Sequence, residues 1–298
     1  MNRILFETDE IVDGIATFGG ERAEHVMNVL HGEVGQVLKT GEIDGLIGTS
    51  EIISIAPYPT RPRVEAHTSS DRFAAASPGD TADGSAVTAP RGEDASGTVR
   101  ITVHCSHTER SLAPWVDLIL APPRPRVMKR LLPQLATMGV GRIFLVGARK
   151  VEKDFWGATL LKPENYRPLL IDGLMQAGTS ILPILETRRN FRKFVKEELD
   201  TLWPEARRIV AHPYTVPDAP SRRGADKTDC CYHATTRGRV GYGNPLLAIG
   251  PEGGWTDEEV ALLEEHGFAR YSLGSRILRT DTATIALLAQ LMKEFGAC

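Results

Sequence analysis

The sequence has little of what marks secreted, membrane and strongly basic proteins. Its 298 residues include only 4 cysteines, too few for a disulfide framework, which favours a reducing compartment. No apolar run approaches the roughly 18 residues that a membrane-spanning helix needs, and the N-terminus becomes acidic where a signal peptide would be apolar. The formal net charge of −3 argues against a histone-like protein. We therefore expect a cytoplasmic protein without a membrane partner.

Several common catalytic motifs are also missing. The sequence contains no GxxxxGK[ST] phosphate loop, no HExxH zinc helix and no GxSxG nucleophile elbow. The segment CCYH at 230–233 is a weak metal motif, because adjacent cysteines do not easily share one tetrahedral site. The segment GYGNPL at 241–246 begins like a dinucleotide fingerprint, but its sixth residue is Leu and a strand follows it. We expect no metal and no dinucleotide cofactor.

The first third of the chain is patterned as short strands. Residues 3–6, 37–40 and 45–53 have strand character and are separated by Gly and Asp turn signals. A short helix is predicted at 21–30, where three apolar side chains share one stripe. Strand patterning resumes at 99–104. Several short strands with one helix predict a small β-barrel.

One segment of this region differs sharply from the rest. Of the thirty residues at 69–98, twenty-five are Ala, Ser, Gly, Asp, Thr or Pro, and none is Leu or Ile. Such a segment cannot bury enough apolar surface to offset its ordering entropy, so we predict a disordered insertion within the first domain. A true domain boundary at this point is the alternative. The predicted domains are residues 1–112 and 113–298.

The remaining two thirds alternate between apolar strands and helices. The predicted strands are residues 116–121, 142–146, 181–184, 208–211 and 245–250, and the predicted helices include 125–138, 166–180 and 285–295. Short, continuously apolar strands alternating with helices predict an α/β fold whose parallel sheet is covered on both faces. The polar stretch 217–243 is predicted to be a surface loop.

The segment AIGPEGGWTDEE at 248–259 is the first of two candidate functional loops. A buried strand enters a glycine-rich turn, and a helix follows that Thr256 caps with Glu259 three residues on. Glycines at the carboxyl end of a parallel strand let the backbone approach a ligand, and open α/β sheets bind ligands at this edge. A purely structural turn is the alternative.

The segment SLGSRILRTDTA at 272–283 is the second candidate loop. It places two arginines and one aspartate just before an apolar helix. Arginines near a helix N-terminus are suited to hold an anion or a phosphate backbone. An exposed loop with an ordinary helix cap is the alternative reading.

Together, the two segments resemble the small-subunit (16S) ribosomal RNA uridine-N3 methyltransferases of the SPOUT class. HVMNVL at 25–30, followed by a glycine-rich β pattern, is similar to the PUA-like RNA-binding domain of that family. Residues 118–121, the helix at 126–140 and Gln176 match the middle of the family more loosely.

The resemblance implies a fold, a cofactor and partners. Family members carry a parallel-sheet domain whose C-terminus forms a trefoil knot, an exception to the rule against knots. S-adenosylmethionine binds in that knot, members act as homodimers, and no metal is needed. The implied RNA partner is 16S rRNA or the small ribosomal subunit. The implied cofactor-binding residues are Ile249, Gly250, Gly253, Gly254, Leu273, Gly274, Ile277, Leu278 and Thr282.

Methylation of uridine at N3 requires removal of the N3 proton and in-line attack on a sulfonium methyl group. The protein must therefore orient two substrates and stabilise a developing anion. Arg276 and Arg279 are candidates for phosphate binding or anion stabilisation, and Glu252 and Asp281 for orientation or proton acceptance. The implied RNA-binding residues are His25, Arg124, Arg126, Lys129 and Arg130.

The chain also departs from the family pattern. Where the family carries a Glu-Gln-x-x-Arg element, Met175 and Thr179 replace the charged pair around Gln176, and Asp281 stands where Glu is usual. Two alternatives follow: a SPOUT methyltransferase acting on another RNA position or on a ribose 2′-hydroxyl, or a non-catalytic RNA-binding ribosome-assembly factor. A basic cluster at apparent helical spacing is either a solvated face or a further phosphate contact: Arg188, Arg189, Arg192, Lys193 and Lys196.

Overall fold

A computed structural model of the protein describes residues 3–57, 99–213 and 244–295. The chain forms two compact units. The first is made of Met1–Asp9, Leu38–Thr49 and Ser106–Cys298, and the second of Glu10–Val37 and Ser50–Cys105. The predicted insertion at 69–98 and the predicted surface loop at 217–243 both lie outside the described residues. The division into domains at 112/113 stays a prediction.

The N-terminal strands form a mixed six-stranded sheet in the order β1-β4-β5-β6-β3-β2. Its elements are β1 (Ile4–Phe6), η1 (Thr8–Glu10), β2 (Ile11–Val12), β3 (Ile15–Phe18), α1 (Gly20–Asn28), β4 (Val37–Glu42), β5 (Ile47–Pro57) and β6 (Val99–Glu109). β1 pairs with β4 in parallel, whereas β3 pairs antiparallel with β2 and β6. The predicted strands are present. The sequence pattern missed β2 and β3, which are too short to show a period. The barrel and its PUA-like character stay predictions.

A second six-stranded sheet lies wholly in the first unit and is parallel, in the order β12-β10-β11-β7-β8-β9. Its strands are β7 (Val116–Leu120), β8 (Val140–Val146), β9 (Ile184–Arg188), β10 (Arg208–Ala211), β11 (Leu246–Ile249) and β12 (Ala269–Tyr271). Every residue of β7 and β11 is buried, as expected where helices cover both faces. The predicted parallel sheet and α/β class are confirmed.

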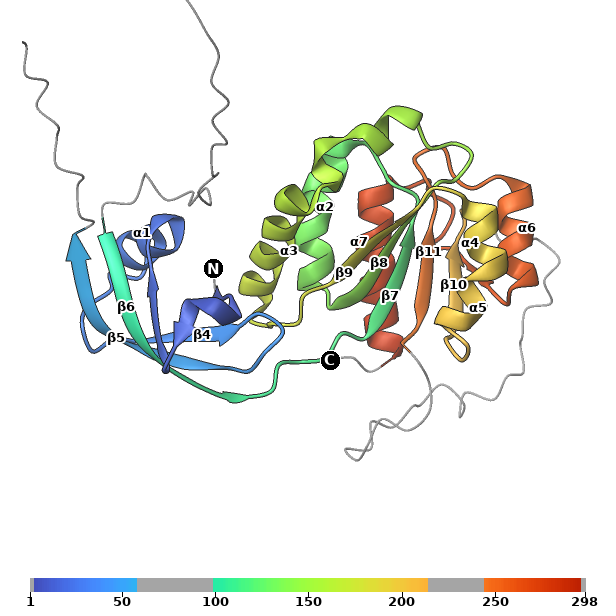
Figure 1. Ribbon diagram of the computed structural model, residues 1–298. Coiled ribbons are helices and arrows are strands. Elements are labelled where there is room, and N and C mark those ends of the chain that lie inside the picture. Colours follow the sequence, from blue (N-terminus) through green and yellow to red (C-terminus); the bar gives the residue numbers. More distant parts are fainter. Residues whose placement is uncertain (1–2, 58–98, 214–243, 296–298) are drawn as a thin grey trace, which may run out of the picture. The chain divides into compact units, whose positions relative to one another are not determined.

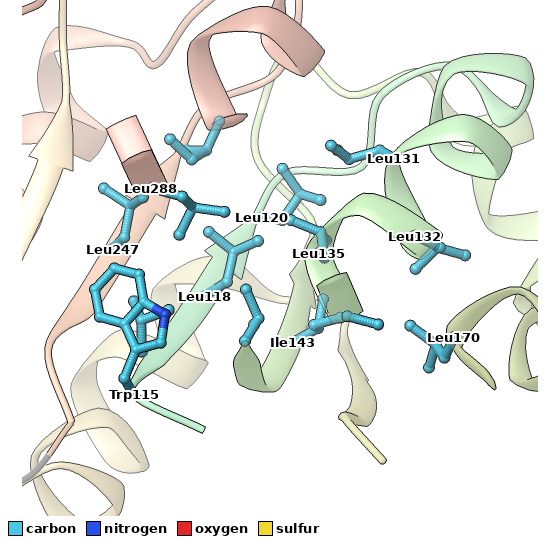
Figure 2. Packing of buried hydrophobic residues seen from close by; sticks show 14 of the residues in the cluster. Trp115, Leu118, Leu120, Leu131, Leu132, Leu135, Ile143, Leu170, Leu247 and Leu288 are labelled. Carbon is cyan, nitrogen blue, oxygen red and sulfur yellow. The ribbon is translucent and has the colours of Figure 1, made fainter. Parts of the chain in front are cut away.

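Helices cover both faces of this sheet (Figure 1). One face carries α2 (Pro125–Thr137), α3 (Pro163–Ala177) and α7 (Thr280–Glu294), and the other carries α4 (Phe191–Glu197), α5 (Leu199–Leu202) and α6 (Asp257–Glu265). The short turns η2 (Lys153–Gly157) and η3 (Thr159–Leu161) precede α3. Leu118 and Leu120 of β7 join the leucines of α2 in the first core (Figure 2), whereas Ile119 between them points to the second. This alternation explains why β7 is apolar throughout.

Three predicted boundaries were wrong, each for a local reason. The strand predicted at 181–184 begins only at Ile184, directly after Pro183, which has no backbone N–H to donate. The helix predicted to reach residue 180 ends at Ala177, because Gly178 adopts the left-handed conformation of a C-cap with φ of 77°. The helix predicted to begin at residue 285 begins one turn earlier, at Thr280.

The first strand is tied to the parallel-sheet part of the same unit. The guanidinium of Arg3 donates to the carbonyl oxygens of Gly178, Thr40 and Gly48 at 3.0, 2.6 and 2.9 Å. Because the guanidinium donates to three carbonyl oxygens at once, the position of the Arg3 side chain is closely defined.

Among the described residues, no helix combines the length and the apolar character that crossing a bilayer requires.

Candidate functional site

The first candidate loop begins where β11 ends at the carboxyl edge of the parallel sheet. The backbone N–H of Ala121 donates to the carbonyl of Ile249 at 2.9 Å, so β11 stays paired with its neighbour to its last residue. The chain then turns, and the N–H of Gly254 donates to Pro251 at 2.8 Å. Gly254 has a φ of +69°, which a residue with a side chain adopts only at a cost. The turn therefore favours glycine at this position.

Gly250 lies against the indole ring of Trp255. A Cβ on Gly250 would lie 3.0 Å from Cδ1 and 3.1 Å from Nε1 of the Trp255 indole. Trp255 is 5% exposed and its ring centroid lies 5.2 Å from that of Phe191. Its indole Nε1 is buried and has no hydrogen-bond partner in the part of the chain that the structure describes. A larger residue at position 250 would therefore require Trp255 to shift by a few tenths of an ångström.

The helix after this loop is capped as predicted. Thr256 Oγ1 accepts from the N–H of Glu259, and the Glu259 carboxylate accepts from the N–H of Thr256, which completes a capping box. Glu259 is buried, and its other oxygen accepts from the N–H of Arg149 at 2.7 Å. The loop is thus held at its far end by α6 and by the segment that follows β8.

Lys150 is a loop contact that the sequence pattern did not reveal. Its Nζ donates to the carbonyl of Gly253 at 2.9 Å and to that of Trp255 at 3.5 Å. Lys150 and Gly253 are 103 positions apart. The sequence offered one indication of this contact: Lys150 follows a predicted strand. The carboxyl ends of parallel strands share one edge of the sheet, so residues after different strands can meet there.

The second candidate loop follows β12 at the same edge and presents apolar side chains to solvent. Leu273, Ile277 and Leu278 are 41%, 78% and 37% exposed. Gly274 has a φ of +121°, and its N–H donates to Ser272 Oγ at 3.2 Å. Exposed leucine and isoleucine clustered on one short loop are typical of a surface that another molecule covers.

Helix α2 connects the charged residues of both loops. Arg124, at its N-cap, pairs with Glu252 of the first loop at 3.1 Å. Arg130, two turns along, pairs with Asp281 at the start of α7 at 3.3 Å. Arg279 lies 3.5 Å from the same Asp281 carboxylate. The structure therefore brings both predicted catalytic acids to the helix that was predicted to bind RNA.

The other predicted cations are exposed around these pairs. Arg126 and Lys129 of α2 and Arg276 of the second loop are exposed, and none forms an ion pair with any residue that the structure describes. Thr282 is exposed in the first turn of α7. His25 lies on α1 in the second compact unit, where its Nε2 is buried and lacks a partner among the described residues. The roles of all these residues stay predictions.

The predicted basic cluster is largely neutralised. Arg188 is the last residue of β9, so the helical spacing predicted for it was wrong, and it pairs with Glu186 and Glu198 at 2.7 Å each. Arg192 pairs with Glu258 at 2.8 Å, and Lys193 with Glu197 at 3.8 Å. Arg189 stacks over the Trp156 ring at 5.8 Å. Most of the cluster is thus an ion-paired face.

Comparison with known proteins decides the family. Residues 110–292 match the model of a family described as RNA methyltransferase domain. The chain belongs to the RNA methyltransferase domain family. A ribosomal RNA small subunit methyltransferase E from Treponema pallidum is 27% identical over 301 residues, covering 100% of this chain and 92% of that protein. The resemblance predicted from the two loops is thereby confirmed at the level of the family, and with it the enzyme class.

Solved structures share the fold of this RNA methyltransferase. A putative methyltransferase from Legionella pneumophila, solved with the cofactor SAM, aligns with a TM-score of 0.60 at 21% identity, covering 98% of this chain and 97% of that one. A small-subunit rRNA methyltransferase E from Neisseria gonorrhoeae, bound to S-adenosyl methionine, aligns with a TM-score of 0.59 at 18% identity, covering 98% and 97%.

Proposed function

We propose that this protein uses S-adenosylmethionine to methylate a uridine at N3 in the 16S rRNA of the small ribosomal subunit, in the cytoplasm. The observation that carries the proposal is the pair of loops at one edge of the parallel sheet, both joined to the basic helix α2. Family membership supports methyl transfer to RNA. The names of the whole-length relatives support small-subunit rRNA as the substrate.

The two loops suit this cofactor in their chemistry. Gly250 and Gly254 keep side chains out of the first loop, so that backbone groups can approach a ligand. Leu273, Ile277 and Leu278 offer exposed apolar surface that suits a purine ring. When bound, S-adenosylmethionine supplies the activated methyl group. We further propose that the chain after β11 forms the trefoil knot of the SPOUT class, that the N-terminal sheet is its PUA-like RNA-binding domain, and that the enzyme is a homodimer.

Residues of this chain then bind the RNA, accept the proton and stabilise the developing charge. Arg124, Arg126, Lys129 and Arg130 hold the RNA backbone on α2, since guanidinium and ammonium groups bind phosphates. A carboxylate, Glu252 or Asp281, accepts the proton from uridine N3. Arg276 or Arg279 stabilises the negative charge that develops on N3 and O4. Holding both substrates in line supplies much of the rate enhancement.

Methyl transfer to isolated small ribosomal subunits tests the proposal. Subunits from cells that lack the protein are incubated with the purified enzyme and S-adenosylmethionine, and the digested rRNA is analysed by mass spectrometry. We expect one new 3-methyluridine per subunit, and we expect the purified protein to bind S-adenosylmethionine at equilibrium. A methyl group on ribose or on another base would support the alternative SPOUT activity. Binding of RNA and cofactor without transfer would identify a non-catalytic assembly factor.

A further inference from the structure

Helix α2 carries two kinds of cation on one exposed stretch. Arg124 and Arg130 have carboxylate partners, Glu252 and Asp281, whereas Arg126 and Lys129 have none among the described residues. Arg124 and Arg130 are 66% and 59% exposed, so both remain accessible to a ligand despite their partners. Of the four cations to which the proposed function assigns the RNA phosphates, two thus already have carboxylate partners in the protein.

Both ion pairs lie at the surface, where they can be exchanged, although Asp281 is only 21% exposed against 39% for Glu252. Exposed pairs contribute about 0–1 kcal/mol, because water screens them and two side chains lose freedom. An RNA phosphodiester carries one negative charge, as a carboxylate does, and can likewise accept two parallel hydrogen bonds from an arginine. The N-terminus of α2 adds to the attraction at Arg124, because no side chain caps it and its first turn contains no acid. Because the RNA backbone presents several phosphates to α2 at once, one of them is able to replace Glu252 at this position.

We propose that Glu252 and Asp281 are the counter-ions of α2 in the RNA-free enzyme, and that RNA phosphates displace them when the substrate binds. This inference rests on the proposed function for the identity of the ligand as RNA. Displacement frees Glu252, next to the first loop, only when RNA is present, whereas Asp281 keeps its contact with Arg279. The step that makes the proton acceptor available is thus coupled to substrate binding.

The same exchange predicts unequal contributions from neighbouring cations. A phosphate that binds Arg126 or Lys129 breaks no protein contact, whereas one that binds Arg124 or Arg130 must first break an ion pair. Neutralising an unpaired cation should therefore weaken RNA binding more than neutralising a paired one. Glu252 and Asp281 consequently act against RNA affinity in the free enzyme.

Fluorescence anisotropy with a labelled 20-nucleotide uridine-rich RNA measures the exchange without methyl transfer. We expect Glu252→Gln and Asp281→Asn each to tighten RNA binding about two- to fivefold, which corresponds to the free energy of an exposed ion pair. Asp281→Asn keeps the oxygen that accepts from the N–H of Thr282, so α7 keeps its first-turn contact. In an Arg124→Gln background, Glu252→Gln should have no effect.

Glu264→Gln is the matched control. Glu264 is 39% exposed, as is Glu252, and pairs with Arg270 at 2.6 Å, away from α2. The Glu264→Gln variant measures the general effect on RNA binding of removing one negative charge. Unchanged or weaker binding by Glu252→Gln, a gain equal to that of Glu264→Gln, or a gain that persists without Arg124 would overturn the proposal. Because the assay detects binding alone, a failure to form 3-methyluridine would refute the proposed function and leave this result standing.

Discussion

The indole Nε1 of Trp203 donates a hydrogen bond of 2.7 Å to the buried carboxylate of Asp117, 86 positions away in the chain. Asp117 is 2% exposed and also accepts from the backbone N–H and the Nε of Arg142, each at 2.9 Å. The Arg142 guanidinium lies 4.6 Å from the centre of the Trp203 ring. One carboxylate thus joins β7, β8 and the end of α5.

Removing this carboxylate should destabilise the protein strongly. Asp117→Ala leaves a buried indole N–H and a backbone N–H without an acceptor, and leaving a buried donor unsatisfied costs about 1–3 kcal/mol. Urea unfolding measures the change. Asp154→Ala, at an exposed position, is the control and should shift stability by less than about 0.5 kcal/mol. A loss below about 1 kcal/mol for Asp117→Ala would contradict the expectation.

Gly173 permits the close packing of α3 on α2. A Cβ at this position would lie 2.1 Å from the carbonyl oxygen of Pro133, a backbone atom that cannot move away cheaply. Gly173→Ala should therefore cost about 1–3 kcal/mol through overpacking, although alanine favours helices. Gly157→Ala is the matched control, because its Cβ would meet nothing within 4 Å. Thermal unfolding of both variants decides: equal midpoints would show that the contact relaxes without cost.

Gly250→Ala tests the close contact between Gly250 of the first loop and Trp255. The added methyl group would lie 3.0–3.1 Å from atoms of Trp255, which would have to shift by a few tenths of an ångström. Under the proposed function, we expect affinity for S-adenosylmethionine to fall about tenfold or more, which is about 1.4 kcal/mol. Isothermal titration calorimetry measures the affinity, with Gly157→Ala as the control that should bind like the parent protein. Normal binding by a folded Gly250→Ala variant would place the cofactor elsewhere.

His107 should make stability depend on pH. Burial lowers the pKa of His107 below its ordinary value of 6.5, with Glu42 opposing and Arg3 adding to the shift. The unfolded chain then binds a proton on this residue at a higher pH than the native state does. Stability from this group is complete above pH 6.5 and falls as the pH drops below 6.5 towards the lowered native pKa.

The measurement is a comparison of urea midpoints at pH 7.5 and 5.5 for the parent protein and His107→Gln. Glutamine retains a hydrogen-bonding group near Thr40, whose Oγ1 lies 2.8 Å from Nε2 of His107. The parent protein should lose more stability between the two pH values than the variant does. Equal losses would show that other groups dominate the acid response.

The predictions from sequence were confirmed for features that depend on residues close together in the sequence. The capping box at Thr256 and Glu259 lies within one helical turn, and its two residue types nearly suffice to define it. The apolar strands of the parallel sheet were found for a similar reason, since burial on both faces leaves an unbroken apolar run. β12 and α5 were missed, because three or four residues carry no measurable period.

By itself, the sequence determined the order of strands and helices, the two glycine- and arginine-containing loops and the family they indicate. Only the tertiary structure decided which charges meet. Arg130 and Asp281 are 151 positions apart, and Lys150 and Gly253 are 103 apart, so no local pattern relates them. Parallel strands bring their carboxyl ends to one edge of the sheet, where the turn after β11 places Glu252 beside Arg124. Packing of α2 against α7 places Asp281 beside Arg130. Local propensity sets the elements, whereas burial of the shared core sets the contacts between them.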